Sequence, residues 1–329
     1  MHLPNVGDVN PRRLRWGNWL TQLVVTRKCN LACGYCNEYD KTSKPIPIDT
    51  LKRVVTHLHG LGTFSLDLTG GETLLHPQLF DLLDHAKKVG IPRRRMITNG
   101  FLLTEAMIHE LNRLELYNMQ ISVDGVHRNE ETEKVLDNVH KRLDLLHRFA
   151  KFRVTIGVVI GSTNFDEADE IVAFARDRDF HVNLNLLHDE NGQLRLPKEA
   201  LHKYRELVTT IHGKHYNLDG DYRWRMVNDI DADFRCRAGA RYLYVDEFQQ
   251  VVWCSQTRFD GPKKPLFDYT WDDMKAAFYT DKPCSNGCTV GCARQVSRVD
   301  EWRPIGKQAM RLPSPIASEV LTQLRRRLP

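Results

Sequence analysis

The sequence predicts an α/β fold in which parallel strands alternate with helices, followed by a small cysteine-rich α+β domain. Between residues 20 and 187, six short apolar runs alternate with segments whose apolar residues recur at helical spacing. Five of the eight cysteines lie from residue 236 onward, where this alternation has stopped. Regular alternation with short connections implies parallel strands joined by right-handed crossovers.

The expected elements follow in order from the apolar pattern. Strands are expected near 20–27, 63–69, 94–98, 117–123, 152–160 and 181–187. Helices are expected near 50–60, 78–89, from Thr104 onward, and near 132–149, 166–178 and 197–212. Asp49 is a suitable N-cap for the first helix, and Gly90 is suited to end the second. We expect four parts: a lead-in over 1–19, the strand–helix domain over 20–213, the cysteine-rich domain over 214–312 and a basic tail over 313–329.

Composition narrows the class of protein. Of the 329 residues, 41% are hydrophobic and 27% are charged, which is ordinary for a soluble enzyme. No apolar run approaches the ~20 residues of a membrane span, and the N-terminus lacks a signal-peptide core, so we expect a cytoplasmic protein. The net charge is +5, and its densest sources, residues 12–15 and 325–327, lie at opposite ends. Without aromatic residues interleaved, they predict solvated termini rather than a nucleic-acid partner.

Three cysteines stand directly after the first predicted strand, in the pattern Cys29-x3-Cys33-x2-Cys36. Thiolates held in one short loop can face a single centre, and sulfur ligands favour iron–sulfur clusters, zinc or copper. A structural zinc site usually needs four protein ligands, and no fourth Cys or His is nearby. A [4Fe–4S] cluster with three protein ligands would leave one iron open. The alternative is three reduced thiols without a metal.

Three further motifs end the next predicted strands: Gly70-Gly71-Glu72, Thr98-Asn99-Gly100 and Ser122-Val123-Asp124-Gly125. Parallel strands bring such ends to one rim, where α/β barrels place their chemistry. A doubly wound open sheet would do the same and stays possible. Glycines allow a close backbone approach to a ligand, and Glu72 could hold its loop or accept from an ammonium group. Each motif could also be an ordinary turn.

The cysteine spacing, the aromatic Tyr35 before the last cysteine and the order of the strand-end motifs resemble the radical S-adenosylmethionine (radical SAM) superfamily, over about residues 20–190. The resemblance implies a partial (β/α)6 TIM-like barrel and a [4Fe–4S] cluster held by Cys29, Cys33 and Cys36, whose open iron binds SAM. It further implies cofactor-binding roles, beside the SAM amino group, ribose or adenine, for Tyr35, Gly70, Gly71, Glu72, Asn99, Ser122 and Asp124.

The late cysteines form a second constellation. The stretch from Cys236 to Cys254 predicts a β-hairpin that brings both thiols together, and Cys284, Cys288 and Cys292 follow on a glycine-containing loop. This resembles the SPASM/twitch extension of radical SAM enzymes, although Gln249-Gln250 stand where that family often has glycine. Five cysteines suit the single-cluster twitch form, with one auxiliary [4Fe–4S] cluster and one spare thiol. Zinc is the alternative.

The resemblance implies an oxidoreductase that reductively cleaves SAM to a 5′-deoxyadenosyl radical and abstracts a hydrogen atom from a substrate. An auxiliary cluster would accept an electron, and a flavodoxin- or ferredoxin-like protein would supply the reductant. Peptide maturases often carry an N-terminal leader-binding domain, and fewer than twenty residues precede the first strand, which favours a small-molecule substrate over a ribosomal peptide. A different class also stays possible: a non-catalytic iron–sulfur or zinc module for binding or electron transfer.

Overall fold

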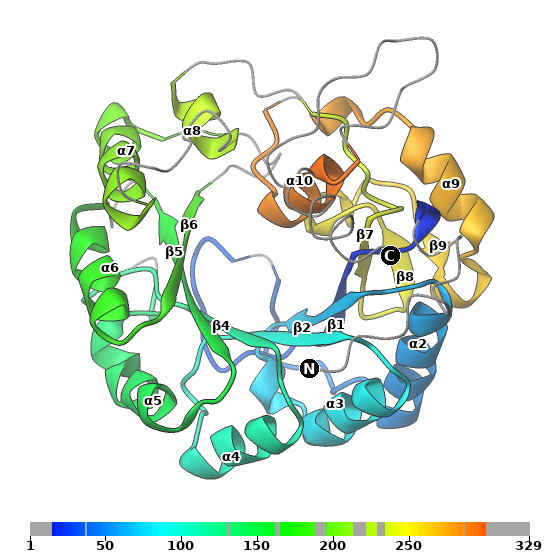
Figure 1. Cartoon of the computed structure of the whole chain (residues 1–329), viewed down its shortest axis with the longest axis horizontal. Coiled ribbons are helices and arrows are strands. Elements are labelled where there is room, and N and C mark those ends of the chain that lie inside the picture. Colours follow the sequence, from blue (N-terminus) through cyan, green and yellow to red (C-terminus); the bar gives the residue numbers. More distant parts are fainter. Residues whose placement is uncertain are drawn as a thin grey trace, which may run out of the picture.

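One curved nine-stranded sheet organises the protein, in the order β6-β5-β4-β3-β2-β1-β7-β8-β9 (Figure 1). The computed structural model describes residues 15–36, 38–129, 132–161, 165–187, 194, 196–212, 222–228, 234–285 and 287–300. The strands are β1 (Leu20–Thr26), β2 (Ser65–Gly70), β3 (Arg93–Thr98), β4 (Asn118–Ser122), β5 (Arg153–Ile160), β6 (His181–Leu186), β7 (Tyr242–Val245), β8 (Gln250–Val252) and β9 (Lys264–Pro265). Neighbours from β6 to β7 are parallel, and the two pairs β7–β8 and β8–β9 are antiparallel.

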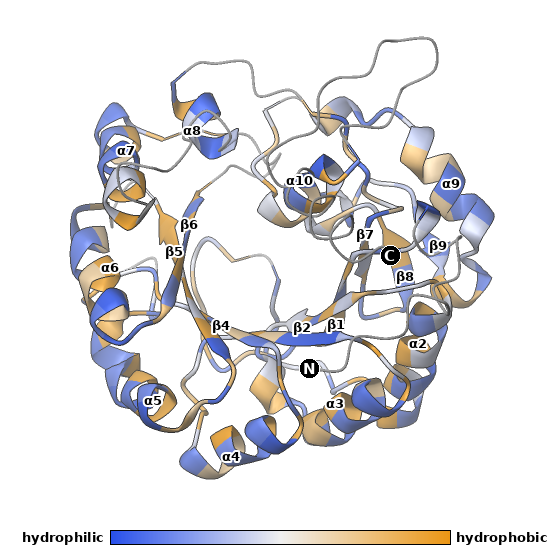
Figure 2. Cartoon of the chain, in the orientation of Figure 1, coloured by the Kyte–Doolittle hydropathy of each residue, from blue (hydrophilic) through white to orange (hydrophobic). Residues whose placement is uncertain are grey.

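Helices surround the convex outer side of this sheet, as expected for a partial (β/α)6 barrel (Figure 1). They are α2 (Ile48–Gly60), α3 (Leu79–Lys88), α4 (Glu105–Arg113), α5 (Leu136–Phe149), α6 (Ala168–Asp177) and α7 (Lys198–His212). Each turns an apolar stripe to the strands, as the orange faces in Figure 2 show, and α2 buries Leu51, Val54, Val55 and Leu58. The predicted partial barrel is therefore confirmed.

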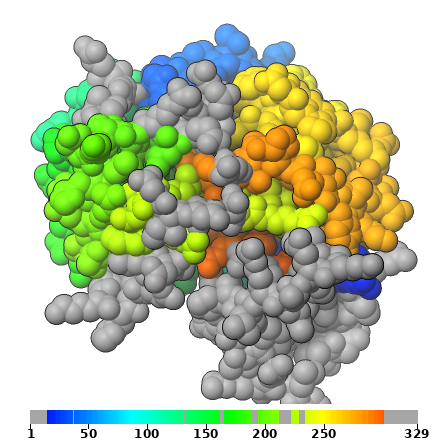
Figure 3. Space-filling view, turned by 90° about the horizontal axis from the view of Figure 1, so that it is seen from above, coloured from blue at the N-terminus to red at the C-terminus, as the bar shows by residue number. Residues whose placement is uncertain are grey.

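The open side of the barrel, between β6 and β7, is covered by two helices from the C-terminal part, α8 (Tyr222–Val227) and α10 (Gly291–Arg298) (Figures 1 and 3). They are in contact, because the Arg294 guanidinium group of α10 lies 4.5 Å from the centre of the Tyr222 ring of α8. A further helix, α9 (Trp271–Tyr279), lies beside the β7–β9 strands. Of the described helices, none combines the length and apolar character needed to cross a membrane.

The predicted hairpin between Cys236 and Cys254 is confirmed, with β7 and β8 antiparallel. Its first strand also pairs with β1 in parallel, so the cysteine-rich segment continues the barrel sheet instead of building a sheet of its own. Gln249, in the turn, has a φ of 57°, a conformation that glycine adopts more easily. The lead-in up to residue 14, the boundary at residues 213 and 214 and the tail over 313–329 lie outside the described residues, so the predicted domain division stays a prediction.

Two local predictions were wrong. Asp49 does not cap α2, because the helix begins one residue earlier and Pro47 occupies the cap position. Helix α5 begins at Leu136 rather than near residue 132, because the backbone of Asp124 donates a hydrogen bond to the Lys134 carbonyl oxygen at 2.7 Å and holds that stretch as a loop. By contrast, Thr104 does cap α4, where its hydroxyl accepts a hydrogen bond from the Met107 amide.

Candidate active site

A cavity of about 160 Å³ lies at the C-terminal ends of β1 to β4, where the sequence placed the candidate residues. All three cysteines of the first loop line it, together with residues from the ends of three further strands. The lining residues are Cys29, Leu31, Cys33, Cys36, Glu38, Tyr39, Thr69, Gly70, Gly71, Ile97, Thr98, Asn99, Ser122 and Lys134. The predicted convergence of the strand-end motifs on one rim is confirmed.

The three thiols form one small apolar cluster with Leu31, and Tyr35 and Tyr39 pack against it. Cys29 and Cys33 are buried, and Cys36 is half-buried. Burial raises the pKa of Cys29, and the nearby Cys36 raises it further. A soft donor set of three thiols facing one cavity fits an iron–sulfur cluster. As their side chains are oriented, no three described Cys, His, Asp or Glu residues in the chain converge closely enough to hold a metal ion.

The two glycines after β2 pack against the backbone that leads into the cysteine loop. The Gly71 amide donates a hydrogen bond to the Thr26 carbonyl oxygen at 2.8 Å. A Cβ atom on Gly70, whose φ is +144°, would lie 2.0 Å from that oxygen, and one on Gly71 would lie 2.3 Å from the Arg27 oxygen. We expected these glycines to let the backbone approach a ligand; the structure shows that they let two protein segments touch, and both also line the cavity.

Glu72 joins its own loop to the end of β3 at the rim. Its buried carboxylate accepts hydrogen bonds from the Thr98 hydroxyl at 2.5 Å, the Asn99 amide at 2.8 Å and the Leu74 amide at 2.9 Å. Of the two roles considered for it, the structure places Glu72 in the first, which is to hold its loop. Glu72 is not among the residues that line the cavity. Asn99, which it positions, donates from its amide to Asn30 in the cysteine loop at 2.9 Å.

Tyr35 and Asp124 meet through a residue that the sequence analysis missed, Lys134. The Tyr35 hydroxyl donates to the buried Asp124 carboxylate and accepts from the Lys134 ammonium at 2.9 Å. Burial alone would lower the pKa of Lys134, but Asp124, Tyr35 and Cys33 raise it overall, so the side chain stays charged. Among the described lining residues Lys134 carries the only positive charge. Ser122 lines the cavity, whereas Tyr35 and Asp124 do not and instead contact Lys134.

The five late cysteines separate into four and one. The pKa of Cys236 is raised to about 11, mainly by burial and also by the neighbouring Cys254 and Cys284. Burial likewise raises the pKa of Cys288 to about 12, with contributions from Cys254 and Cys236. The charged neighbours of Cys292 are instead Asp67, Arg95 and Arg223, and Gln22 donates to its sulfur at 3.6 Å. Cys292 packs against the same apolar cluster as Cys236 and Cys254, but its thiol lies among the charged groups of the barrel interior.

Comparison with known proteins adds a family match. The model of the radical SAM superfamily matches residues 23–193. The PqqA peptide cyclase of Bradyrhizobium diazoefficiens is 30% identical over 165 residues, which cover 48% of this chain and 43% of that protein. A probable GTP 3′,8-cyclase of Archaeoglobus fulgidus is 28% identical over 257 residues, covering 74% of this chain and 84% of the other. The chain spans about half the length of the first curated relatives it matches.

Solved structures with the same fold include two at low sequence identity. Streptococcus suis SuiB superposes with a TM-score of 0.61 at 15% identity, covering 82% of this chain and 67% of that one. The enzyme anSMEcpe, solved with bound AdoMet and a Cp18Cys peptide, superposes with a TM-score of 0.59 at 17% identity, covering 93% and 98%. At these identities the likeness concerns the fold.

Proposed function

The chain belongs to the radical SAM superfamily, and we propose that it cleaves SAM reductively and abstracts a hydrogen atom from a small-molecule substrate. The observation that carries this proposal is the meeting of three thiols with Gly70, Gly71, Asn99 and Ser122 around one cavity. When bound there, a [4Fe–4S] cluster with SAM supplies a 5′-deoxyadenosyl radical. The predicted cytoplasmic location and the protein reductant stay predictions.

Within this proposal, the residues of the chain hold and orient the cofactors. Cys29, Cys33 and Cys36 are the cluster ligands, and the glycine pair fixes the loop that carries them. Lys134 offers a positive charge to the carboxylate of SAM. Tyr35 and Asp124 hold the ammonium group of Lys134 in place. The contact that we expected of Asp124 with ribose thus becomes indirect in the proposal.

The proposed ligands of one auxiliary cluster are Cys236, Cys254, Cys284 and Cys288, because these thiols act on one another, whereas Cys292 lies among Asp67, Arg95 and Arg223. Four thiolates would saturate a [4Fe–4S] cluster, so its proposed role is to accept an electron from the substrate radical rather than to bind substrate. The net reaction would then be a two-electron oxidation.

Two relatives that align over most of the chain support a small-molecule substrate. The probable GTP 3′,8-cyclase aligns over 74% of the chain, and so does the S-adenosylmethionine-dependent nucleotide dehydratase RSAD2 of Danio rerio, at 25% identity. A second candidate is modification of a ribosomal peptide, favoured by the 30% identity to a PqqA peptide cyclase over half of the chain. A non-catalytic iron–sulfur or zinc module would not account for the strand-end segments around the cavity.

The decisive test is SAM cleavage by anaerobically reconstituted protein. With dithionite and SAM, wild-type protein should form 5′-deoxyadenosine. Cys33→Ala should form none while keeping its circular dichroism spectrum, because Cys33 belongs to a small cluster of the cysteine loop and not to the core of the barrel. Absence of 5′-deoxyadenosine from iron-loaded wild-type protein would refute the proposal. Full product formation by Cys33→Ala would remove that residue from the ligand set.

A further inference from the structure

The inner face of the barrel sheet is polar and accessible. Along β2 to β6, side chains facing the helices are buried, whereas many on the other face are partly exposed. On this inner face Gln22, Asp67 and Arg95 lie side by side, since the strand register pairs Gln22 with Asp67 and Asp67 with Arg95. Gln120 and Asn185, both partly exposed, continue the polar lining.

Asp67 and Arg95 form an ion pair that leaves both groups incompletely bonded. Arg95 Nε lies 3.1 Å from Asp67 Oδ1, but neither atom has a hydrogen bond of good geometry. Asp67 is almost fully buried, and burial raises its pKa to about 6. Arg95 also lies close enough to the Cys292 thiol to lower its pKa. A buried ion pair with unmet hydrogen bonds costs stability, so a functional reason for it is expected.

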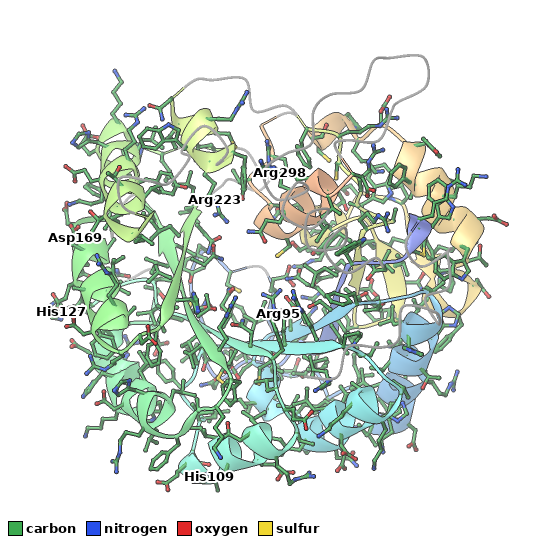
Figure 4. The ribbon with its side chains drawn as sticks, viewed as in Figure 1. Arg95, His109, His127, Asp169, Arg223 and Arg298 are labelled. Carbon is green, nitrogen blue, oxygen red and sulfur yellow. The ribbon has the colours of Figure 1, made fainter. Side chains whose placement is uncertain are left out.

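A second guanidinium group reaches the same region from the opposite side. Arg223, on α8, donates to the Asn185 side-chain oxygen of β6 at 3.0 Å and packs so closely on α10 that a Cβ at Gly291 would lie 2.7 Å from its Nη2. Figure 4 shows Arg95 and Arg223 on the barrel interior, one from the strands and one from the covering helix. Cys292 lies between them: it follows Gly291, against which Arg223 packs, and its sulfur accepts from Gln22, the register neighbour of Asp67, at 3.6 Å. Both guanidinium groups lower the pKa of the Cys292 thiol.

This region lies next to the cofactor cavity. Thr69 and Ile97 line that cavity, and Asp67 and Arg95 precede them by two residues on the same strand faces, about 7 Å away along the strand. A radical generated in the cavity can react only with a group in contact with it, so the substrate must occupy adjacent space. The two arginines are therefore placed to hold a part of the substrate distant from the reacting carbon.

We propose that Arg95 and Arg223 bind an anionic group of the substrate, a phosphate or a carboxylate, inside the barrel. This inference rests on the proposed function. Among the described charged groups that act on Cys292, two guanidinium groups and one carboxylate sum to one positive charge. Planar guanidinium groups match both kinds of anion. Asp67 holds Arg95 in place through Nε and competes with the incoming anion for its charge.

Reconstituted protein tests the proposal without knowledge of the whole substrate. Sodium tripolyphosphate serves as the phosphate probe and sodium glutarate as the carboxylate probe, titrated over the millimolar range while the midpoint of thermal unfolding is recorded. Sodium chloride at equal ionic strength is the reference. We expect one probe to raise the midpoint well beyond the chloride series, and the identity of that probe distinguishes a phosphorylated substrate from a carboxylic acid.

Three variants separate an anion site from a structural ion pair. Arg95→Gln and Arg223→Gln should each weaken probe binding at least about tenfold. Asp67→Asn should strengthen it about three- to tenfold, since a competing negative charge is removed. Arg148→Gln, an exposed arginine on α5, is the matched control and should bind like wild type.

Failure of this inference differs from failure of the proposed function. If neither probe stabilises wild-type protein beyond chloride, or if Arg148→Gln loses as much binding as Arg95→Gln, the anion site is refuted. Weaker binding by Asp67→Asn than by wild type would also refute it, because a purely structural pair gives that result. Formation of 5′-deoxyadenosine without substrate is measured on the same samples, and only its absence from wild-type protein would refute the proposed function.

Discussion

At the scale of single residues, Gly71 has a contact that no other residue type could make. Replacement by alanine would put a Cβ atom 2.3 Å from the Arg27 oxygen and 2.5 Å from the Lys28 oxygen, both backbone atoms that no side-chain rotation can move. We expect Gly71→Ala to lower the free energy of unfolding by about 1–3 kcal/mol and to reduce iron bound at the first cysteine loop. Denaturant unfolding and iron analysis would measure the two effects.

Gly60→Ala is the matched control for this variant. Gly60 ends α2, and a Cβ atom there would meet nothing within 4 Å. Alanine is the better helix residue, so stability should stay equal or rise by about 0.5–1 kcal/mol, with iron content unchanged. Equal iron loss in both variants would show that the glycine pair does not fix the cluster loop.

Lys134 provides a second prediction at this scale. Loss of its charge in Lys134→Gln should weaken SAM binding about tenfold, because a charge-assisted hydrogen bond in a partly buried site is lost. Anaerobic calorimetric titration of reconstituted protein with SAM would measure this. Lys141→Gln, on the exposed face of α5, should bind SAM like wild type. Wild-type affinity in Lys134→Gln would exclude the proposed role.

The sequence revealed the cysteines but not Lys134, and the reason is physical. Cysteines at short spacing indicate a shared metal site by themselves. A lysine ten residues beyond Asp124 forms no sequence motif that would indicate a role in the site. Apolar periodicity extended the helix back to residue 132, which would have turned Lys134 into a surface lysine. Only the backbone hydrogen bond from Asp124 to Lys134, a contact between distant turns, shows that the stretch is a loop.

At the scale of elements, the start of α10 separates the fourth cluster ligand from a thiol of another environment. Cys288 precedes the helix and interacts with Cys236 and Cys254, whereas Cys292, in its first turn, faces Asp67 and Arg95. We expect wild-type and Cys292→Ser protein to bind about eight irons per chain and Cys288→Ser about four. Iron and sulfide analysis would decide, and iron loss in Cys292→Ser would reverse the assignment.

Strands and helices were predicted well where burial repeats regularly and less well elsewhere. Strands β1 to β6 each bury one face under a helix, and that periodicity can be read from the sequence. The pairing of β7 with β1 could not be predicted from the sequence, because the residues of an apolar strand do not indicate which distant strand it pairs with. Cys292 likewise belongs to a regularly spaced cysteine series and is distinguished only by where α10 lies.

At the scale of the whole molecule, one ionic network ties the cysteine loop to the C-terminal hairpin. Glu38 contacts Arg27 and lies 2.5 Å from Arg258 Nη1, and its carboxylate accepts from the Tyr244 hydroxyl at 2.8 Å. Glu247 completes the network with Arg27 at 2.8 Å. We expect Glu38→Gln to lower the free energy of unfolding by about 2–3 kcal/mol, because two buried guanidinium groups lose a shared partner.

Glu110→Gln is the comparison for this variant. Glu110 pairs with Arg113 at 2.6 Å on the exposed surface of α4, where such a pair contributes less than about 1 kcal/mol. Denaturant unfolding of both variants at low salt would measure the difference. Equal losses would show that the link between loop and hairpin contributes no more than a surface ion pair.

The position of β1 between β2 and β7 has a consequence for the order of events during synthesis. Tyr242 of β7 hydrogen-bonds Gln22 of β1 across 220 residues, and closing so long a loop is slow. When the first three cysteines leave the ribosome, the strand before them still lacks both of its neighbours, because β2 and β7 come later in the chain. The sheet that supports the cysteine loop is then incomplete. Cluster insertion should therefore follow release of the hairpin from the ribosome rather than accompany translation.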